Sequence, residues 1–138
     1  MPAKILIIDD EIDMLMLLRM IIENNTEYGV ETTNNPSEGL KLLTQGSYDL
    51  VISDLKMPGL DGLELFAEIR EVNREIPVVI ITAYGSQEAA DEAMTKGVAD
   101  FITKPFKKER ILFTIGRALE LARLKQENLA LKKKLDPD

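Results

Sequence analysis

Four short apolar runs, all rich in β-branched residues, recur along the sequence and are separated by segments long enough to be helices. They occupy residues 5–8, 50–52, 78–81 and 101–102. Because these runs are continuous and do not alternate with polar residues, they predict β-strands that are covered on both faces. A further run at residues 30–33 is more polar and more alternating, and it therefore predicts an edge strand.

The segments between these runs carry the signals of helices. An apolar stripe that starts at Ile12 predicts a helix over residues 10–24. Capping residues open three further helices, and glycines close two of them. The opening signals are Asn35 followed by Pro36, the capping-box spacing of Asp61 and Glu64, and Ser86; the closing glycines are Gly46 and Gly97. The last predicted helix covers residues 107–135.

Strands that alternate with helices imply right-handed crossovers and a parallel sheet. Five such units predict an α/β fold with a doubly wound, five-stranded parallel sheet and an extended C-terminal helix. In such folds ligands bind beyond the carboxyl ends of the strands, at the point where the strand order reverses.

The residue types exclude several kinds of chemistry. The chain has no cysteine and no histidine, which excludes disulfides, metals bound through Cys or His, and a Ser-His-Asp triad. The net charge of −7 argues against a general affinity for nucleic acid. No apolar run approaches the ~20 residues that span a bilayer, and the first strand follows the N-terminus too closely for a signal peptide. We therefore expect a cytoplasmic protein without membrane contact.

Polar side chains follow four of the predicted strands. They are Asp9, Asp10 and Glu11 after the first strand, Asp54 after the third, Thr82 at the end of the fourth and Lys104 after the fifth. A parallel sheet brings such residues to one edge. Converging carboxylates either raise a pKa or bind a cation, and a hard divalent ion such as Mg2+ suits oxygen ligands. With a lysine and a hydroxyl nearby, a carboxylate could act as a nucleophile and form an acyl phosphate.

Each of these residues also has a simpler explanation. An Asp-Asp pair after a strand is usually a helix N-cap, Asp54 alone would be read as a turn residue, and an isolated Thr82 or Lys104 carries almost no signal. Their joint placement at the ends of four strands is what favours a functional site.

In combination, these residues resemble the receiver domains of two-component response regulators. The matching segments are Ile7-Ile8-Asp9-Asp10-Glu11, Asp54-Leu-Lys-Met-Pro-Gly-Leu-Asp-Gly62, Ile81-Thr82-Ala83 and Phe101-Ile-Thr-Lys104-Pro105-Phe106. The resemblance covers about residues 3–118. It implies a flavodoxin-like sheet with the strand order 2-1-3-4-5, a receiver domain at residues 1–118, a C-terminal helical extension at residues 119–138, and a cis peptide bond between Lys104 and Pro105.

The resemblance also implies the chemistry of the site. Asp54 would accept a phosphoryl group from a partner histidine kinase in a reaction that depends on Mg2+. The implied metal ligands are Asp10, Asp54 and the backbone carbonyl of Lys56, with Asp9 acting through water. Lys104 and Thr82 would contact the phosphoryl group.

A conformational switch formed by Thr82 and Phe101 follows from the same resemblance. Thr82 would move toward the phosphate, and Phe101 would then turn inward. Many members have tyrosine at the position of Phe101, so any hydrogen bond from that hydroxyl is lost here. Simple packing in the core explains Phe101 as well, and the two explanations are compatible.

Two other functions fit parts of the pattern. A phosphatase of the haloacid dehalogenase type needs a second aspartate two residues after the nucleophile, where this chain has Lys56. A degenerate receiver that only dimerises would not need the intact set of strand-end residues. We therefore expect a signalling switch that catalyses its own phosphorylation and dephosphorylation, turns over no outside metabolite, and controls an output such as transcription.

The C-terminal segment differs from the rest of the chain in charge. Residues 1–116 hold 20 acidic and 11 basic residues, a net charge of −9, whereas residues 117–135 hold 2 acidic and 6 basic residues, a net charge of +4. A segment of opposite charge is expected to be a separate kind of element, and it resembles the linker helix of NtrC-type transcription activators. A fragment of a longer regulator and a stand-alone receiver are both compatible with the sequence.

This segment also has the spacing of a coiled coil. The a and d positions are Leu121, Leu124, Asn128, Leu131 and Leu135. Asn128 occupies an a position, where a buried polar residue fixes the register of parallel pairs. The g and e′ positions pair Glu120 with Lys125 and Glu127 with Lys132. The pattern predicts a parallel homodimer, and the alternative is that these leucines pack on the receiver body.

Overall fold

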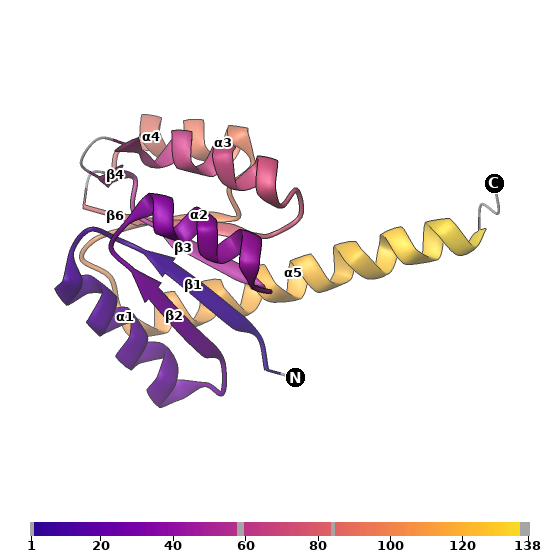
Figure 1. The fold of residues 1–138 in the computed structure, drawn as a ribbon, viewed down its shortest axis with the longest axis horizontal. Helices are drawn as coiled ribbons and strands as arrows, with labels where there is room; N and C mark the ends of the chain where they lie inside the picture. The colour runs from indigo at the N-terminus through magenta and orange to yellow at the C-terminus, as the bar shows by residue number, and fades with distance from the viewer. Residues whose placement is uncertain (1, 58–59, 84, 136–138) are drawn as a thin grey trace.

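The computed structural model describes residues 2–57, 60–83 and 85–135 of the chain. Its centre is a five-stranded parallel sheet in the order β2-β1-β3-β6-β7 (Figure 1). The strands are β1 (Lys4–Ile8), β2 (Gly29–Thr33), β3 (Leu50–Ser53), β6 (Val78–Thr82) and β7 (Asp100–Thr103). Counted along the chain, this is the predicted order 2-1-3-4-5, and the polar strand β2 lies at an edge as predicted.

Helices cover both faces of the sheet. One face is covered by α1 (Ile12–Asn25) and α5 (Lys108–Leu135); the other is covered by α2 (Pro36–Gln45), α3 (Gly62–Val72) and α4 (Gln87–Lys96). Each central strand therefore buries side chains in both directions. In β1, Ile5 and Ile7 pack with α1 and α5, while Leu6 and Ile8 pack with α2 and α3. This arrangement explains why the strands read as continuous apolar runs.

The predicted capping signals act where the sequence places them. The Asn35 side chain accepts hydrogen bonds from the backbone N–H groups of Ser37 and Glu38, and Ser86 accepts one from that of Ala89. Gly97 ends α4 with a φ of 108°, a left-handed conformation that favours glycine. The predicted capping box at Asp61 involves a side chain that lies outside the described residues.

One apolar residue of the first helix is placed differently from the prediction. Ile12 was expected to belong to the buried stripe of this helix, but its side chain is 59% exposed, while Leu15, Leu18 and Ile22 are buried. Ile12 is the first residue of α1. It therefore precedes the turns of α1 that supply the buried residues.

A short antiparallel hairpin, β4 (Lys56–Met57) and β5 (Leu60–Asp61), follows β3 and was not predicted. It carries the chain from the end of β3 to the start of α3. Gly62 closes this connection, and its backbone N–H donates a hydrogen bond to the carbonyl of Leu55. A Cβ at Gly62 would lie 2.5 Å from the carbonyl oxygen of Asp54, which is closer than Cβ atoms approach other atoms in proteins. The peptide bond between Lys104 and Pro105 is cis, as the resemblance implied.

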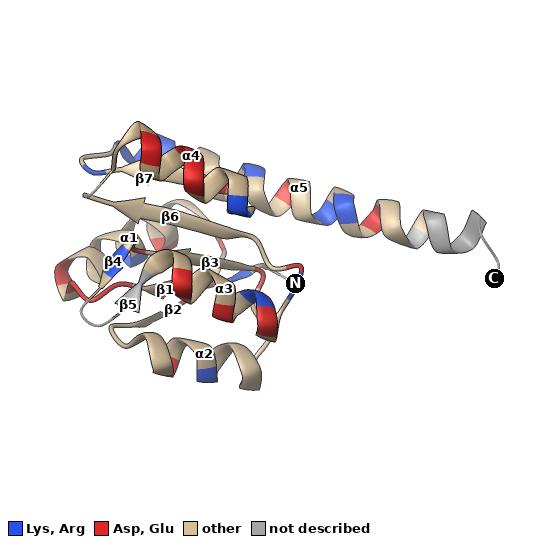
Figure 2. Ribbon diagram, turned by 90° about the horizontal axis from the view of Figure 1, so that it is seen from above, with Lys and Arg blue, Asp and Glu red and all other residues tan. Residues whose placement is uncertain are grey.

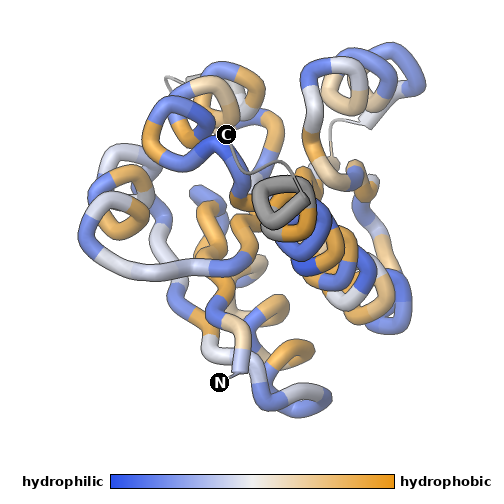
Figure 3. The backbone as a smooth tube through the Cα atoms, turned by 90° about the vertical axis from the view of Figure 1, so that its right-hand side faces the viewer, coloured by the Kyte–Doolittle hydropathy of each residue, from blue (hydrophilic) through white to orange (hydrophobic). Residues whose placement is uncertain are grey.

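Helix α5 is much longer than the body that it covers. Ile111, Ile115 and Ala118 are buried against the sheet, Lys125 still pairs with Glu75 of the body at 3.7 Å, and the last turns of the helix project from the body (Figures 1 and 3). Acidic and basic residues both lie along the described part of this segment (Figure 2). The helix crosses residue 118 without interruption, and Leu119 still packs on the core. In the part of the chain that the structure describes, no helix combines the length and hydrophobicity that a membrane span requires.

Candidate functional site

The parallel register brings the ends of four strands together. Ile8 pairs with Ser53 across β1 and β3, and Thr82 pairs with Thr103 across β6 and β7. One residue further along, the backbone N–H of Asp54 donates to the carbonyl of Ile8 at 3.2 Å. The backbone N–H of Lys104 donates to the carbonyl of Thr82 at 2.8 Å. Backbone hydrogen bonds thus fix the positions of Asp54 and Lys104, the residues that follow β3 and β7.

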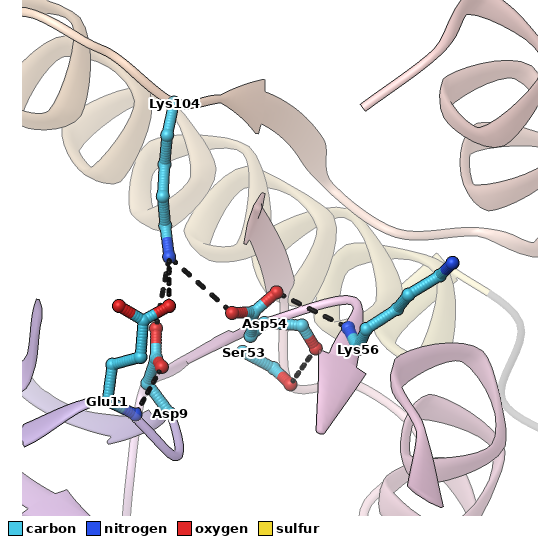
Figure 4. Close-up of polar contacts among 6 residues, drawn as sticks. All are labelled: Asp9, Glu11, Ser53, Asp54, Lys56 and Lys104. Atoms are coloured by element: carbon cyan, nitrogen blue, oxygen red, sulfur yellow. Dashed lines mark hydrogen bonds and ion pairs between the residues drawn. The ribbon is translucent and has the colours of Figure 1, made fainter. Parts of the chain in front are cut away.

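The ammonium of Lys104 is the centre of the site. Its Nζ lies 3.5 Å from Oδ2 of Asp54, 3.6 Å from Oδ2 of Asp9 and 3.8 Å from Oε1 of Glu11 (Figure 4). The side chain of Lys104 is mostly buried, and those of Asp9 and Asp54 are only 3% exposed. Glu11 is 61% exposed and forms the solvent side of the group. One positive charge therefore faces three carboxylates.

Asp54 is held by backbone as well as by Lys104. Its Oδ1 accepts a hydrogen bond from the backbone N–H of Lys56 at 3.3 Å. Ser53 Oγ donates to the carbonyl oxygen of Asp54 at 3.0 Å, and it is itself buried. The carboxylate therefore has a fixed orientation at the end of β3, with Oδ2 turned toward Lys104.

Asp9 has a strongly perturbed ionisation. Burial raises the pKa of its carboxyl group to about 6, and the negative charges of Asp54 and Asp10 add to this effect. The backbone N–H of Glu11, which donates to Oδ1 at 2.9 Å, and the charge of Lys104 both oppose it. A buried carboxylate that is costly to ionise is one that a cation would stabilise.

The carboxylates of Asp9, Glu11 and Asp54 could together hold a metal ion, because one oxygen from each lies within 4.8 Å of the others. An all-oxygen donor set of this charge suits Mg2+. Asp10 is exposed and is not a member of this group. Glu11 is a member that the sequence reasoning did not assign to the metal, although its place after the first strand was a usable signal.

The other predicted site residues lie around this centre. Thr82 is fully buried at the end of β6. Phe101, in β7, is partly buried and packs against the core cluster on the α4 side of the sheet. Lys56 takes part through its backbone N–H, and its side chain is exposed on β4. The roles assigned to these residues stay predictions.

The predicted coiled-coil seam is open to solvent in the single chain. Leu121, Leu124 and Leu131 are each about half exposed, and Asn128 is exposed too. Lys125, between Leu124 and Asn128, forms an ion pair with Glu75 of the receiver body at 3.7 Å, so the coiled coil and packing on the body both stay predictions. The side chain of Leu135 lies outside the described residues. Glu120 and Glu127 both form ion pairs with Arg123 of the same helix at 2.6 Å.

The fold and the strand-end residues together define a receiver of phosphoryl groups of the kind used in two-component signalling. Residues 5–115 match the family described as the response regulator receiver domain, and the chain belongs to that family. Receiver domains of two-component response regulators bind Mg2+ at an acidic pocket, are phosphorylated on an aspartate by histidine kinases, and control output domains such as transcription regulators. Family membership sets the haloacid dehalogenase alternative aside.

Curated relatives are longer transcriptional regulators. The chain is 43% identical over 119 residues to the transcriptional regulatory protein GlrR of Escherichia coli K12, covering 86% of this chain and 27% of that protein. It is 37% identical over 139 residues to the nitrogen assimilation regulatory protein NtrX of Azorhizobium caulinodans, covering 99% of this chain and 30% of that protein. The chain thus spans less than a third of the length of these relatives.

Solved structures agree with the fold. NtrX from Brucella abortus, in complex with ADP, superposes with a TM-score of 0.88 at 37% identity, covering 95% of this chain and 30% of that one. A response regulator receiver domain protein from Clostridium thermocellum superposes with a TM-score of 0.82 at 33% identity, covering 88% and 98%. The five-stranded sheet and its helices are therefore those of a receiver domain.

Proposed function

We propose that this chain is a phosphorylation-dependent switch in which Asp54 accepts a phosphoryl group from a histidine kinase. The observation that carries the proposal is the position of the Asp54 carboxylate. It is almost fully buried at the end of β3, its Oδ2 lies 3.5 Å from Lys104, and it borders a group of oxygens suited to a divalent cation. Buried carboxylates beside a cation are well placed to act as nucleophiles toward phosphorus.

In the proposed reaction, an oxygen of Asp54 attacks the phosphorus of the donor. The bond between phosphorus and the donor's imidazole nitrogen breaks, the nitrogen keeps the electron pair, and an acyl phosphate forms on Asp54. Lys104 and Thr82 contact the phosphoryl oxygens and offset their charge. Attack of water on phosphorus later returns the carboxylate and releases inorganic phosphate, so the chain completes both steps itself without an outside metabolite.

The residues present fit the Mg2+ that the family binds. We propose Asp10, Asp54 and the backbone carbonyl of Lys56 as direct ligands, with Asp9 acting through water. The raised pKa of Asp9 and the gathering of three carboxylates support a cation at this edge of the sheet. Bound Mg2+ would neutralise the charge that develops during transfer. The protein itself orients the Asp54 oxygens and holds Lys104 beside them.

The response to phosphorylation is proposed to pass through Thr82 and Phe101 to the C-terminal helix. The half-exposed leucines of the seam support a parallel homodimer through residues 119–138, which we propose as an extension separate from the receiver domain at residues 1–118. The relatives that are named transcriptional regulatory proteins support a transcriptional output and a cytoplasmic location. No direct contact of this chain with nucleic acid or membrane is part of the proposal.

The acceptor can be tested by intact mass after incubation with acetyl phosphate and Mg2+. The parent should gain the mass of one phosphoryl group, and Asp54→Asn should gain none, because the amide removes the nucleophilic oxygen and the charge. Asp49→Asn is the matched control, since Asp49 precedes the opposite end of β3, where it accepts a hydrogen bond from the backbone of Lys4. It should label like the parent. Labelling of Asp54→Asn to the parental level would place the acceptor elsewhere.

A further inference from the structure

Glu11 occupies the N-cap position of α1, yet its side chain makes no capping hydrogen bond. Residues at this position usually turn their side chains back to the free N–H groups of the first helical turn. Here the carboxylate lies instead within 3.8 Å of the ammonium of Lys104. Its own backbone N–H is used to hold Asp9. The side chain of Glu11 is therefore directed at the phosphorylation site and away from the helix that it opens.

Glu11 differs from the other two carboxylates of the site in its exposure to solvent. The carboxylates of Asp9 and Glu11 lie close together, with that of Asp54 beside them, and the Lys104 ammonium approaches all three from the same side (Figure 4). Glu11 is the exposed member, whereas Asp9 and Asp54 are almost inaccessible. One of its oxygens lies within 4.8 Å of an Asp54 oxygen. Any donor that brings phosphorus to Asp54 must therefore place its own negative charge near Glu11.

We propose that Glu11 is a specificity-determining residue that discriminates between phosphodonors by their charge. The inference rests on the proposed function, because it concerns the approach of donors to Asp54. The Glu11 carboxylate repels a small donor in proportion to that donor's negative charge, and it competes with the phosphoryl oxygens for Lys104. A donor that offers the phosphoryl group with less net charge meets a smaller barrier at the same site.

Two small donors of different charge make this testable. Acetyl phosphate is a dianion at neutral pH, and its transfer to Asp54 breaks the P–O bond and releases acetate. Phosphoramidate is largely a monoanion, and its transfer breaks the P–N bond and releases ammonia once the nitrogen is protonated. In Glu11→Gln we expect the rate constant for acetyl phosphate to rise more than that for phosphoramidate. The ratio of the two should increase about threefold to tenfold, given the Coulomb energy of such charges in a wet site.

The experiment measures both rate constants by intact mass at saturating Mg2+ and at two ionic strengths. The change in ratio should shrink at higher ionic strength, because salt screens an exposed charge. Glu11→Asp, which keeps the charge, should stay near the parental ratio. Asp13→Asn is the matched control: it removes one exposed charge from the first turn of the same helix. It should leave the ratio unchanged.

Three results would overturn the inference. The ratio could be the same in Glu11→Gln and in the parent, or Asp13→Asn could change it as much, which would make net charge and not position the cause. Alternatively, titration calorimetry could show that Glu11→Gln loses most of its Mg2+ affinity while both donors slow down together, which would make Glu11 a metal ligand. Failure of the proposed function would look different: the parent itself would never be labelled at Asp54, and there would be no rate constants to compare.

Discussion

At the scale of single residues, the site carries more negative charge than Lys104 can balance. Asp9 bears most of this cost because its carboxyl group is buried beside two other acids. The folded protein binds the Asp9 proton with a pKa of about 6, against about 4 for an unfolded chain. Between these values the unfolded state loses the proton first. The contribution of Asp9 to stability therefore falls as the pH rises from about 4 to about 6, and it stays low above that range.

We predict that Asp9→Asn stabilises the protein in metal-free buffer at pH 7. The amide is the same size and can still accept the hydrogen bond from Glu11, but it has no charge to desolvate. The free energy of unfolding in urea should rise by roughly 1–3 kcal/mol at pH 7, and the decline between pH 4 and pH 6 should become shallower. Asp13→Asn, which changes an exposed acid, should alter the free energy of unfolding by no more than a few tenths of a kcal/mol. A loss of stability in Asp9→Asn would mean that the pair with Lys104 outweighs the burial cost.

At the scale of elements, the connection from β3 to α3 depends on glycine. A Cβ at Gly62 would lie 2.5 Å from the carbonyl oxygen of Asp54 and 2.7 Å from Cα of Leu55. These are backbone atoms, so they cannot turn aside as a flexible side chain would. The start of α3 therefore packs directly on the backbone that follows the proposed acceptor.

We predict that Gly62→Ala lowers the free energy of unfolding by about 1–3 kcal/mol and slows labelling by acetyl phosphate, because it shifts the backbone of Asp54. Gly116→Ala is the control within a helix. No atom lies within 4 Å of its added Cβ, so it should stabilise the protein by about 0.5–1 kcal/mol through α5. Urea unfolding measures both variants. Equal effects of the two substitutions would contradict the close approach at Gly62.

Helix α5 is the element through which we predict self-association. Truncation after Arg123 keeps Leu119 and Ala122 but removes most of the seam, so light scattering at tens of micromolar should change from dimer to monomer. Asn128→Leu should strengthen association and loosen the choice of oligomer, because a buried asparagine fixes register at a cost in stability. If the truncated chain dimerises as tightly as the parent, another surface drives assembly.

The elements also show how far sequence reasoning reaches. Continuous apolar runs identified four of the five strands of the central sheet, an alternating run identified the edge strand β2, and capping residues with glycines identified both ends of α2 and α4, because these signals are local. The hairpin of β4 and β5 was missed since strands of two residues have no periodicity to detect. The strand-end rule found Asp9, Asp54, Thr82 and Lys104. It could not determine which of Asp9, Asp10 and Glu11 direct their side chains into the site and which face the solvent. Consecutive residues after a strand follow no fixed period.

At the scale of the whole molecule, Mg2+ should act as a stabilising ligand. A ligand that binds only the folded state adds about 2.7 kcal/mol when it is present at 100 times its dissociation constant. We predict that Mg2+ raises the thermal midpoint of the parent. Asp10→Ala should lose most of this gain if Asp10 is the direct ligand that we propose. An equal gain in Asp10→Ala and the parent would refute that assignment and favour the group formed by Asp9, Glu11 and Asp54.

The 28-residue helix α5 covers the sheet with one part and projects from the body with the other. A continuous helix is stiff in torsion, so it fixes the angle at which any following segment leaves the receiver. Each residue added to or removed from the projecting part would rotate that segment by about 100° and move it by about 1.5 Å. A seven-residue insertion would nearly restore the angle, whereas a two-residue insertion would reverse it. The length of this helix would therefore set the rotation, about the helix axis, of any segment joined to its C-terminal end.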